Sequence, residues 1–246
     1  MTITAIRTPK VLPQKSDFFL LLKKVLPRVR EKSIVVVTSK IIALTEGRFV
    51  NKKNARKKDL IQAEAEYVVA DPEAKYGITL TIKNNLLIPT AGIDESNAKG
   101  TYVFWPKDPQ KSVHAIRAFV KKEYRLRYVG VVITDSRTTP LRRGTVGAAI
   151  AHSGFAALNN YIGKPDVFGR PLLVTQANMM DALAAGAVAV MGEGNEQTPI
   201  AIIEDVPFVQ FQDRNPTQKE LAYVRINLED DLYAPLLLKA KWQKKP

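Results

Sequence analysis

Two short runs of β-branched residues constrain the fold of this 246-residue chain most strongly. Ile34 to Thr38 and Val129 to Thr134 have the length and the Val and Ile content of strands buried inside a sheet. Each run is followed at once by small polar or charged residues, namely Ser39 and Lys40 after the first and Asp135 and Ser136 after the second. Because a rigid strand positions the side chains at its end, both ends are candidate site positions.

Helices and strands alternate along the rest of the chain. Helices are predicted after the N-cap residues Asp17 and Asp108, over Lys57 to Val69, and over the apolar segment Met179 to Met191. Further strands are predicted at Thr2 to Arg7, Ile78 to Ile82, Leu86 to Ile88, Leu172 to Gln176 and Pro199 to Glu204. Since the order has no regular βαβ rhythm, we expect an α/β (α+β mixed) fold, in which helices flank a mixed β-sheet.

The residue types that are scarce exclude several kinds of chemistry. The chain has no Cys, which excludes thiolate catalysis, zinc ribbons, iron–sulfur clusters and disulfide scaffolds. Its two His residues, His114 and His152, have no partnered carboxylate in the sequence pattern, which favours structural roles for both. The longest uncharged apolar run, Ala182 to Gly192, is shorter than the roughly 20 residues of a membrane helix, and the N-terminus has no signal-peptide pattern. We therefore expect a cytoplasmic protein that does not associate with membranes.

The net charge of +13 favours an anionic partner. Nucleic acid is one candidate, but its binding proteins usually interleave aromatic side chains with a basic stripe or present a recognition helix. Neither pattern is found in the sequence. We expect no nucleic-acid partner, and nucleotides or phosphorylated metabolites remain.

Three acidic residues stand in or after apolar stretches: Asp94 in TAGIDESN, Asp135 in VVITDSRT and Glu193 in MGEGNEQT. Oxygen donors from separate loops are what Mg²⁺ or Mn²⁺ takes, and a cation would offset the repulsion among clustered carboxylates. Asp is also favoured in turns for local hydrogen bonding, so a purely structural role stays open. The sequence has neither a GxxxxGK[ST] loop nor a complete GxGxxG fingerprint, which excludes the two common nucleotide cradles.

Six segments, in order and with similar spacing, resemble successive blocks of the coenzyme F420-0:γ-glutamyl ligase family. They are VVVTSKIIALTEGR from Val35, TAGIDESN from Thr90, WPKDPQKSVHAIR from Trp105, VGVVITDSRTTPLRRGTVGAAI from Val129, NYIGKPDVFGRPLLVTQ from Asn160, and LAAGAVAVMGEGNEQTP from Leu183. The resemblance runs from about Thr4 to Asp205. It implies a domain of this family's fold over residues 1–205, with residues 206–246 as a C-terminal extension packing on it.

The resemblance also implies an activity. Members of the family add L-glutamate to a carboxylate of the phosphorylated deazaflavin F420-0, in a reaction that consumes GTP, requires Mg²⁺ or Mn²⁺ and passes through an acyl phosphate. Two cations per site and a homodimer are implied as well. A protein that kept the fold but only binds a nucleotide or a deazaflavin is the alternative, and the retained carboxylates argue against it, since a carrier has no use for a charge cluster that needs a metal.

Site residues follow from the matching positions. The resemblance implies metal ligation by Asp94, Asp135, Ser136 and Glu193. It implies nucleotide contacts from Ser39, Lys40, Asn97, Met191, Gly192, Glu193, Gly194, Asn195, Glu196, Gln197 and Thr198. Asp94, Asp135 and Arg142 are the expected catalytic residues. Each position also has a local structural explanation, for instance glycines that end a helix or an Asn that caps a turn.

The chain departs from the family pattern at three positions. Leu44 stands where the family commonly has a lysine, and Thr138 and Thr139 stand where it commonly has a Gly-Arg pair. These features resemble a branch thought to add γ-linked glutamate to a folate. The surplus of positive charge favours F420-0, which has a phosphodiester, whereas the lost guanidinium favours a folate-like acceptor. The residues alone favour the folate-like acceptor slightly.

Overall fold

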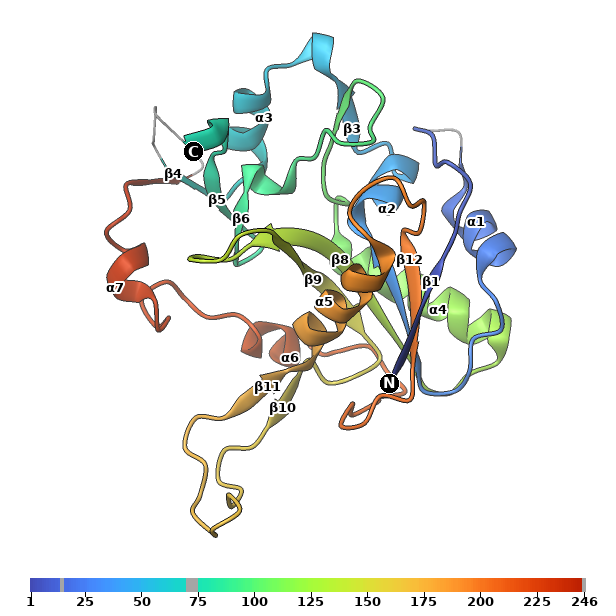
Figure 1. Cartoon of the computed structure of the whole chain (residues 1–246), viewed down its shortest axis with the longest axis vertical. Helices are drawn as coiled ribbons and strands as arrows, with labels where there is room; N and C mark the ends of the chain where they lie inside the picture. Colours follow the sequence, from blue (N-terminus) through green and yellow to red (C-terminus); the bar gives the residue numbers. More distant parts are fainter. Residues whose placement is uncertain (14–15, 70–74, 245–246) are drawn as a thin grey trace.

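A five-stranded sheet forms the centre of the molecule in the computed structural model, which describes residues 1–13, 16–69 and 75–244. Its order is β1-β12-β2-β8-β9 (Figure 1). The strands are β1 (Thr2–Ile6), β12 (Ile200–Glu204), β2 (Ser33–Thr38), β8 (Val129–Thr138) and β9 (Thr145–Ser153). β2 and β8 are parallel and the other neighbours are antiparallel, so the predicted mixed sheet is confirmed.

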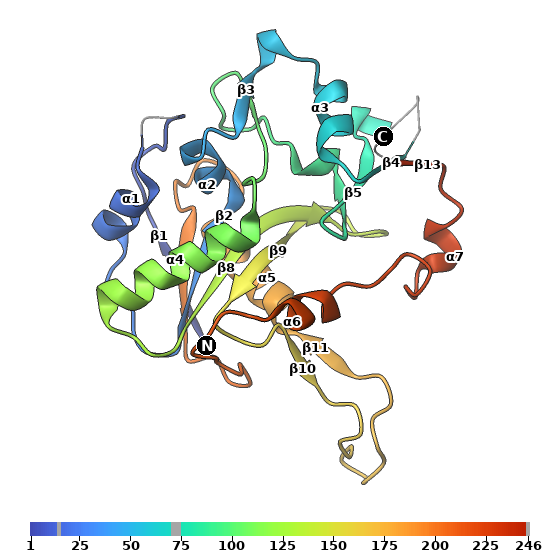
Figure 2. The same ribbon diagram turned by 180° about the vertical axis from the view of Figure 1, so that it is seen from behind.

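Helices cover both faces of this sheet. α1 (Phe18–Val25) and α4 (Pro109–Tyr124) pack on one face, where they meet Val35 and Val37 of β2. α5 (Met179–Met191) packs on the other face, against Ile34 and Val36. Figure 1 shows α5 in front of the sheet, and the reverse view in Figure 2 shows α4 in front. Because both faces are covered, β2 is buried from Ser33 to Val37, as its β-branched composition predicts.

The predicted helix starts are confirmed at atomic detail. The Asp17 carboxylate accepts hydrogen bonds from the backbone amides of Phe19 and Leu20 at 2.8 and 3.0 Å. Asp108 accepts from the amide of Lys111 at 2.9 Å, and Pro109 occupies the first turn of α4. Both caps satisfy amides that have no partner within their helices.

A second, smaller sheet has the order β13-β4-β5-β6 and lies beside the central one. Its strands are β4 (Tyr67–Val69), β5 (Leu80–Lys83), β6 (Leu86–Pro89) and β13 (Trp242–Lys244). The predicted hairpin turn at Asn84 and Asn85 is confirmed, and both residues have positive φ angles, 50° and 59°. Through β13, the C-terminal segment adds an edge strand to this sheet.

Two predicted elements differ from the structure. The helix expected over Lys57 to Val69 is α3 (Lys57–Glu64), because Tyr67–Val69 instead pair with β5 and β13 as strand β4. Of the strand expected over Leu172 to Gln176, only Gln176 lies in a strand, β11 (Gln176–Asn178), which pairs with β10 (Leu158–Asn160). Residues 158–178 form a hairpin arm that projects from the body of the molecule (Figure 1), and most of the apolar run before Gln176 lies on it without a sheet to join.

The remaining elements are short. They are α2 (Ser39–Thr45), β3 (Phe49–Asn51), β7 (Thr101–Val103), α6 (Gln218–Tyr223), α7 (Ala234–Leu237) and the 3₁₀ turns Lys52–Asn54, Lys75–Gly77 and Thr90–Gly92. No helix in the described ranges is long and apolar enough to cross a membrane.

Burial of His152 makes stability depend on pH. The side chain is 2% exposed and packs edge-on to Phe155, and burial lowers its pKa to about 4. An unfolded His titrates near about 6.5, so between these two values the unfolded state binds the extra proton and stability falls as the pH falls. We expect the free energy of unfolding to drop by about 2 to 3 kcal/mol from pH 7 to pH 4 through this group.

Urea unfolding at several pH values measures this effect. The drop attributable to His152 is the difference between the parent and His152→Phe, in which it should vanish. His114, which is only half-buried, provides the control, and His114→Phe should remove a smaller part of the drop. Identical pH profiles for the parent and His152→Phe would contradict the assignment.

Candidate active site

The parallel pair β2 and β8 brings two polar strand ends to one edge of the central sheet. Thr38 pairs with Thr134, so that Lys40, in the first turn of α2, and Asp135, in β8, lie at the same end. Asp94 is held beside them by two backbone hydrogen bonds to Val103 of β7, at 2.8 and 2.9 Å. The structure therefore joins three of the predicted site residues from distant parts of the sequence.

Asp94 and Lys40 form an ion pair. Asp94 also accepts hydrogen bonds from the backbone amide and the hydroxyl of Ser96, at 2.6 and 3.0 Å, and the Lys40 ammonium donates to the Ser96 hydroxyl at 3.0 Å. Burial acts to raise the pKa of Asp94, but the Lys40 ammonium and the Ser96 hydrogen bonds outweigh it and hold that pKa below its usual range. Asp94 is thus ionised, and its carboxylate oxygens are available as ligands for a cation.

Asp135 has the opposite electrostatics. Burial raises its pKa to about 6, while a hydrogen bond donated by the indole Nε1–H of Trp105 acts to lower it. The charge of Asp94 adds to the increase and that of Lys40 reduces it. Both carboxylates, Asp94 and Asp135, therefore lie in the field of Lys40. A divalent cation would neutralise the negative charge that this lysine leaves unbalanced.

The loop after α5 reaches the same place. Glu193 accepts hydrogen bonds from the Ser136 and Thr145 hydroxyls, at 2.7 and 3.3 Å. The side-chain amide of Asn97 donates to the carbonyl of Gly194 at 2.9 Å, which ties this loop to the segment that carries Asp94. The glycine at position 192 has a φ of +80°, and a Cβ there would lie 2.5 Å from the Glu196 carboxyl carbon. The chain follows this tight path because no side chain intervenes.

The donor set fits a divalent metal. Asp94, Asp135, Ser136 and Glu193 supply only oxygen, the donor that Mg²⁺ and Mn²⁺ prefer. Among the described residues, no three carboxylate or imidazole side chains are grouped closely enough to enclose one ion. Mg²⁺ is commonly held by one or two carboxylates together with substrate phosphates and water, so an open arrangement of this kind agrees with a metal shared with a nucleotide.

The other predicted site residues lie in varied surroundings. Ser39 is buried at the start of α2, and the Met191 side chain is buried in the core beneath α5, whereas residues 192–196 are exposed. Arg142 is exposed in the turn between β8 and β9, and in the part of the chain that the structure describes its side chain makes no hydrogen bond or ion pair. Its neighbour in the same block, Arg137, lies 3.5 Å from Asp181 of α5.

Comparison with known proteins agrees with this picture. The family profile described as F420-0:Gamma-glutamyl ligase matches residues 5–205. The chain belongs to this family. It is 34% identical over 212 residues to the coenzyme F420:L-glutamate ligase of Methanococcus maripaludis strain S2, covering 85% of this chain and 82% of that protein. It is 37% identical over 179 residues to the enzyme of the same name from Methanocaldococcus jannaschii, with 71% of each chain covered. The family membership and the amide-forming ligase class expected from the sequence are confirmed.

One contact in the candidate active site, between Trp105 and Asp135, was not expected from the sequence. Trp105 was part of a matching block, but nothing in the sequence connects it with Asp135, thirty residues away. The nearest signal is Gly92 in the AGID segment, whose φ is +69° and whose added Cβ would lie 2.2 Å from the indole Nε1. A glycine can mark such a close approach, although it does not say which residue approaches.

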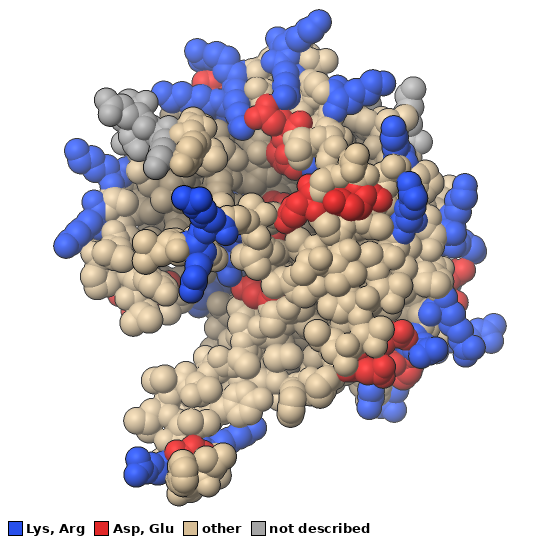
Figure 3. All heavy atoms as spheres, viewed as in Figure 1, with Lys and Arg blue, Asp and Glu red and all other residues tan. Residues whose placement is uncertain are grey.

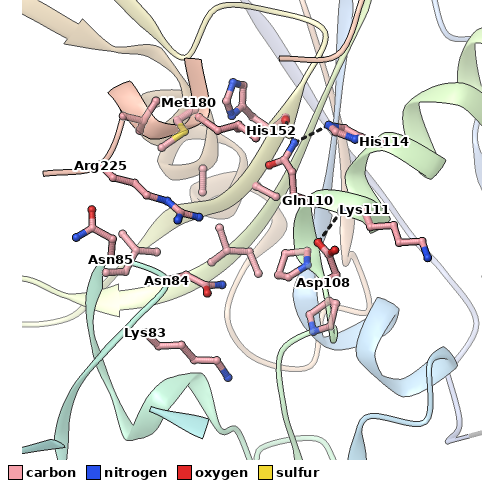
Figure 4. Close-up of a pocket in the computed structure, with 18 of the residues that line it drawn as sticks. Lys83, Asn84, Asn85, Asp108, Gln110, Lys111, His114, His152, Met180 and Arg225 are labelled. Carbon is pink, nitrogen blue, oxygen red and sulfur yellow. Dashed lines mark hydrogen bonds between the residues drawn. The ribbon is translucent and has the colours of Figure 1, made fainter. Parts of the chain in front are cut away.

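A cavity of about 750 Å³ opens beside this region, between β9, the β5–β6 hairpin and the segment after α6. Figure 4 shows Arg225 extending into it between Asn85 and Gln110, which itself contacts His114 at 2.7 Å. Five cationic residues line the cavity, against three acidic ones: Arg48, Lys83, Lys107, Lys111 and Arg225, against Glu64, Asp108 and Asp181. The lining is therefore suited to an anionic ligand.

The two site carboxylates should respond differently to loss of charge. Asp135→Asn keeps an acceptor for the Trp105 indole and removes a carboxylate whose pKa is raised, so we expect activity to be lost and metal-free stability to increase by about 1 kcal/mol at pH 7. Asp94→Asn should also lose activity, but its stability should fall slightly, since a favourable pair with Lys40 is lost from a side chain that is 39% exposed and screened by water.

Turnover assays and urea unfolding without metal test both variants. Wild-type activity in Asp135→Asn would exclude that residue from the reaction. A matched stability increase in both variants would contradict the assignment of the Lys40 pair to Asp94.

Proposed function

We propose that the chain is a GTP-dependent and divalent-metal-dependent γ-glutamyl ligase that adds L-glutamate to a carboxylate of F420-0. The observation that carries the proposal is the placement of Asp94 and Asp135 at the ends of β2 and β8, with Glu193, from a third segment, accepting a hydrogen bond from the neighbouring Ser136 hydroxyl. Carboxylates of this kind can hold divalent cations, and the positive charge of such cations is needed where phosphates and a carboxylate must be brought together.

The reaction has two steps. The acceptor carboxylate attacks the γ-phosphate of GTP, which releases GDP and forms an acyl phosphate. The amine of L-glutamate then attacks the acyl carbon, releases phosphate and loses a proton, which leaves the amide. When bound, two Mg²⁺ or Mn²⁺ ions would reduce the repulsion between these anions and the charge that develops on the transferred phosphoryl group.

The chain's own residues have distinct tasks in this scheme. Asp94, Asp135, Ser136 and Glu193 present oxygen donors. Lys40 holds Asp94 through the ion pair, and its ammonium would be available to a phosphate oxygen when that pair opens. Residues 192–196 are exposed, in the loop that Asn97 ties to the segment carrying Asp94. The amides of Gly192 and Gly194 donate to the Val188 carbonyl and the Glu196 carboxylate, so the amides of Glu193, Asn195 and Glu196 are the candidate donors to phosphates. We expect further nucleotide contacts from Ser39, Asn97, Gln197 and Thr198.

Two observations favour F420-0 over a folate-like acceptor. The relatives compared above are named for coenzyme F420. The cavity beside the site has a net cationic lining, which suits the phosphodiester that folate lacks. Against this, Arg137 points to Asp181 and does not replace the guanidinium that the family commonly carries in this block.

A side-by-side assay tests the proposal. Purified protein is given GTP or ATP, Mn²⁺ or Mg²⁺, L-glutamate, and either F420-0 or folate monoglutamate at equal concentration, and the products are measured by mass spectrometry. We expect F420-0 to gain glutamate with release of GDP, and Asp135→Asn to give none. A higher kcat/KM for folate monoglutamate than for F420-0 would show that the proposed acceptor is wrong. GTP binding without turnover on any acceptor would favour the non-catalytic carrier.

We also propose a homodimer. The hairpin arm exposes apolar side chains that a monomer would leave in water, at 85% for Phe168 and Val174 and 92% for Val167. Figure 3 shows the arm as a largely uncharged projection, with charged residues mainly near its tip. Exposed apolar groups of this density are typical of surfaces that another chain covers.

Light scattering after size exclusion tests the dimer. The parent should have twice the mass of one chain, and Phe168→Asp should shift it toward the monomer. Leu20→Asp, at an exposed site on α1, is the control and should leave the dimer intact. A monomeric parent would contradict the proposal.

A further inference from the structure

The indole of Trp105 sits between the candidate metal site and a partly buried group of charges. Its Nε1–H donates to Oδ2 of Asp135, and the residue itself is 1% exposed. On the opposite part of the ring, the Lys83 ammonium lies 5.1 Å from the ring centroid. The indole therefore contacts a carboxylate through its edge and a cation through its face, the two orientations that the ring's charge distribution favours.

Lys83 is itself held firmly. Its ammonium donates to Glu64 at 2.7 Å and to the carbonyl of Ala91 at 3.3 Å, and its side chain is 10% exposed. Glu64 is shared with Arg48, whose guanidinium lies 2.8 Å from both carboxylate oxygens. One carboxylate thus faces two cations, and the group keeps a net positive charge beneath the indole.

The backbone at Gly92 packs closely against the indole ring. A Cβ added at Gly92 would lie 2.2 Å from Nε1 and 2.5 Å from Cε2 of the indole. Asp94 follows Gly92 by two residues. Trp105 therefore contacts Asp135 directly and also packs against the backbone that leads to Asp94. A side chain confined in this way can hold a metal ligand in one orientation.

We propose that Trp105 is a positioning residue for the divalent cation: its indole N–H fixes the orientation of the Asp135 carboxylate, and the Lys83–Glu64–Arg48 group holds and polarises the indole. The inference rests on the proposed metal-dependent function and deepens it. A cation over the ring face withdraws electron density, which makes the N–H a stronger donor to the carboxylate. Partners of metal ligands that act in this way commonly affect metal affinity by about 10- to 100-fold.

The chain offers a matched control, because it has two Trp residues. Trp242 also donates its indole N–H, to the carbonyl of Leu237 at 2.7 Å, but it lies in the smaller sheet. Trp105→Phe and Trp242→Phe therefore remove the same atoms from two places. With Mn²⁺ alone as the probe, followed by the electron paramagnetic resonance signal of the free ion, Trp105→Phe should weaken binding by about tenfold and Trp242→Phe should not change it.

Two further measurements separate positioning from a general loss of structure. Saturating Mn²⁺ should restore most of the ligase activity of Trp105→Phe, since the defect lies in metal affinity. In Trp242→Phe, Trp105 is the sole tryptophan, and paramagnetic Mn²⁺ should quench its fluorescence. Adding Asp135→Asn to that variant should abolish the quenching.

The outcomes distinguish failure of this inference from failure of the proposed function. If the parent binds no Mn²⁺ in a way that depends on Asp135, the metal site itself is wrong. If the parent binds Mn²⁺ through Asp135 and Trp105→Phe binds it within twofold of Trp242→Phe, the positioning role is wrong. Should Trp105→Phe fail to fold, absence of Mn²⁺ quenching in Trp242→Phe, despite bound Mn²⁺, overturns the inference.

Discussion

The parallel pairing of β2 with β8 is the constraint on which the rest of the site depends. Its register, with Thr38 opposite Thr134, sets Lys40 and Asp135 at one edge of a sheet whose interior is fully buried. Parallel neighbours need covered faces, and α1, α4 and α5 supply that cover. A polar site at the end of buried strands thus has a rigid base, and the loops that carry Asp94 and Glu193 need only be attached to it.

Local sequence signals predicted this base well. The β-branched runs, the Asp17 and Asp108 caps and the paired asparagines act over a few residues, and each behaved as expected. Asp94, Asp135 and Glu193 were also singled out from the sequence as candidates, since each lies in or after an apolar stretch, which is a local feature. Whether these residues bind metal or nucleotide stays a prediction, because their proximity alone does not show a ligand.

What the sequence did not predict depends on contacts between distant segments. Tyr67–Val69 form a strand because β5 and β13 are there to pair with them, and an isolated propensity cannot show this. The arm takes the apolar run before Gln176 away from any sheet. The bond from Trp105 to Asp135 is of the same kind, since it depends on how β8 meets the segment around Gly92.

An irregularity in the pairing of β8 with β9 lies next to the contacts that connect the central sheet to α5 and the glycine-rich loop. Ile133 pairs with Ala151 but Thr134 pairs with Ala149, so β9 carries one extra residue, Ile150, opposite the step from Ile133 to Thr134 and just before Asp135. Such a bulge changes the local twist and redirects the side chains that follow it. The amide of Ala149 is bound by Asp181 of α5 at 2.8 Å, and Asp181 also faces Arg137 of β8. Asp181 thereby attaches α5, the helix that leads into the Glu193 loop, to β8, the strand that carries Asp135. This attachment helps to keep Glu193 and Asp135 in fixed relative positions.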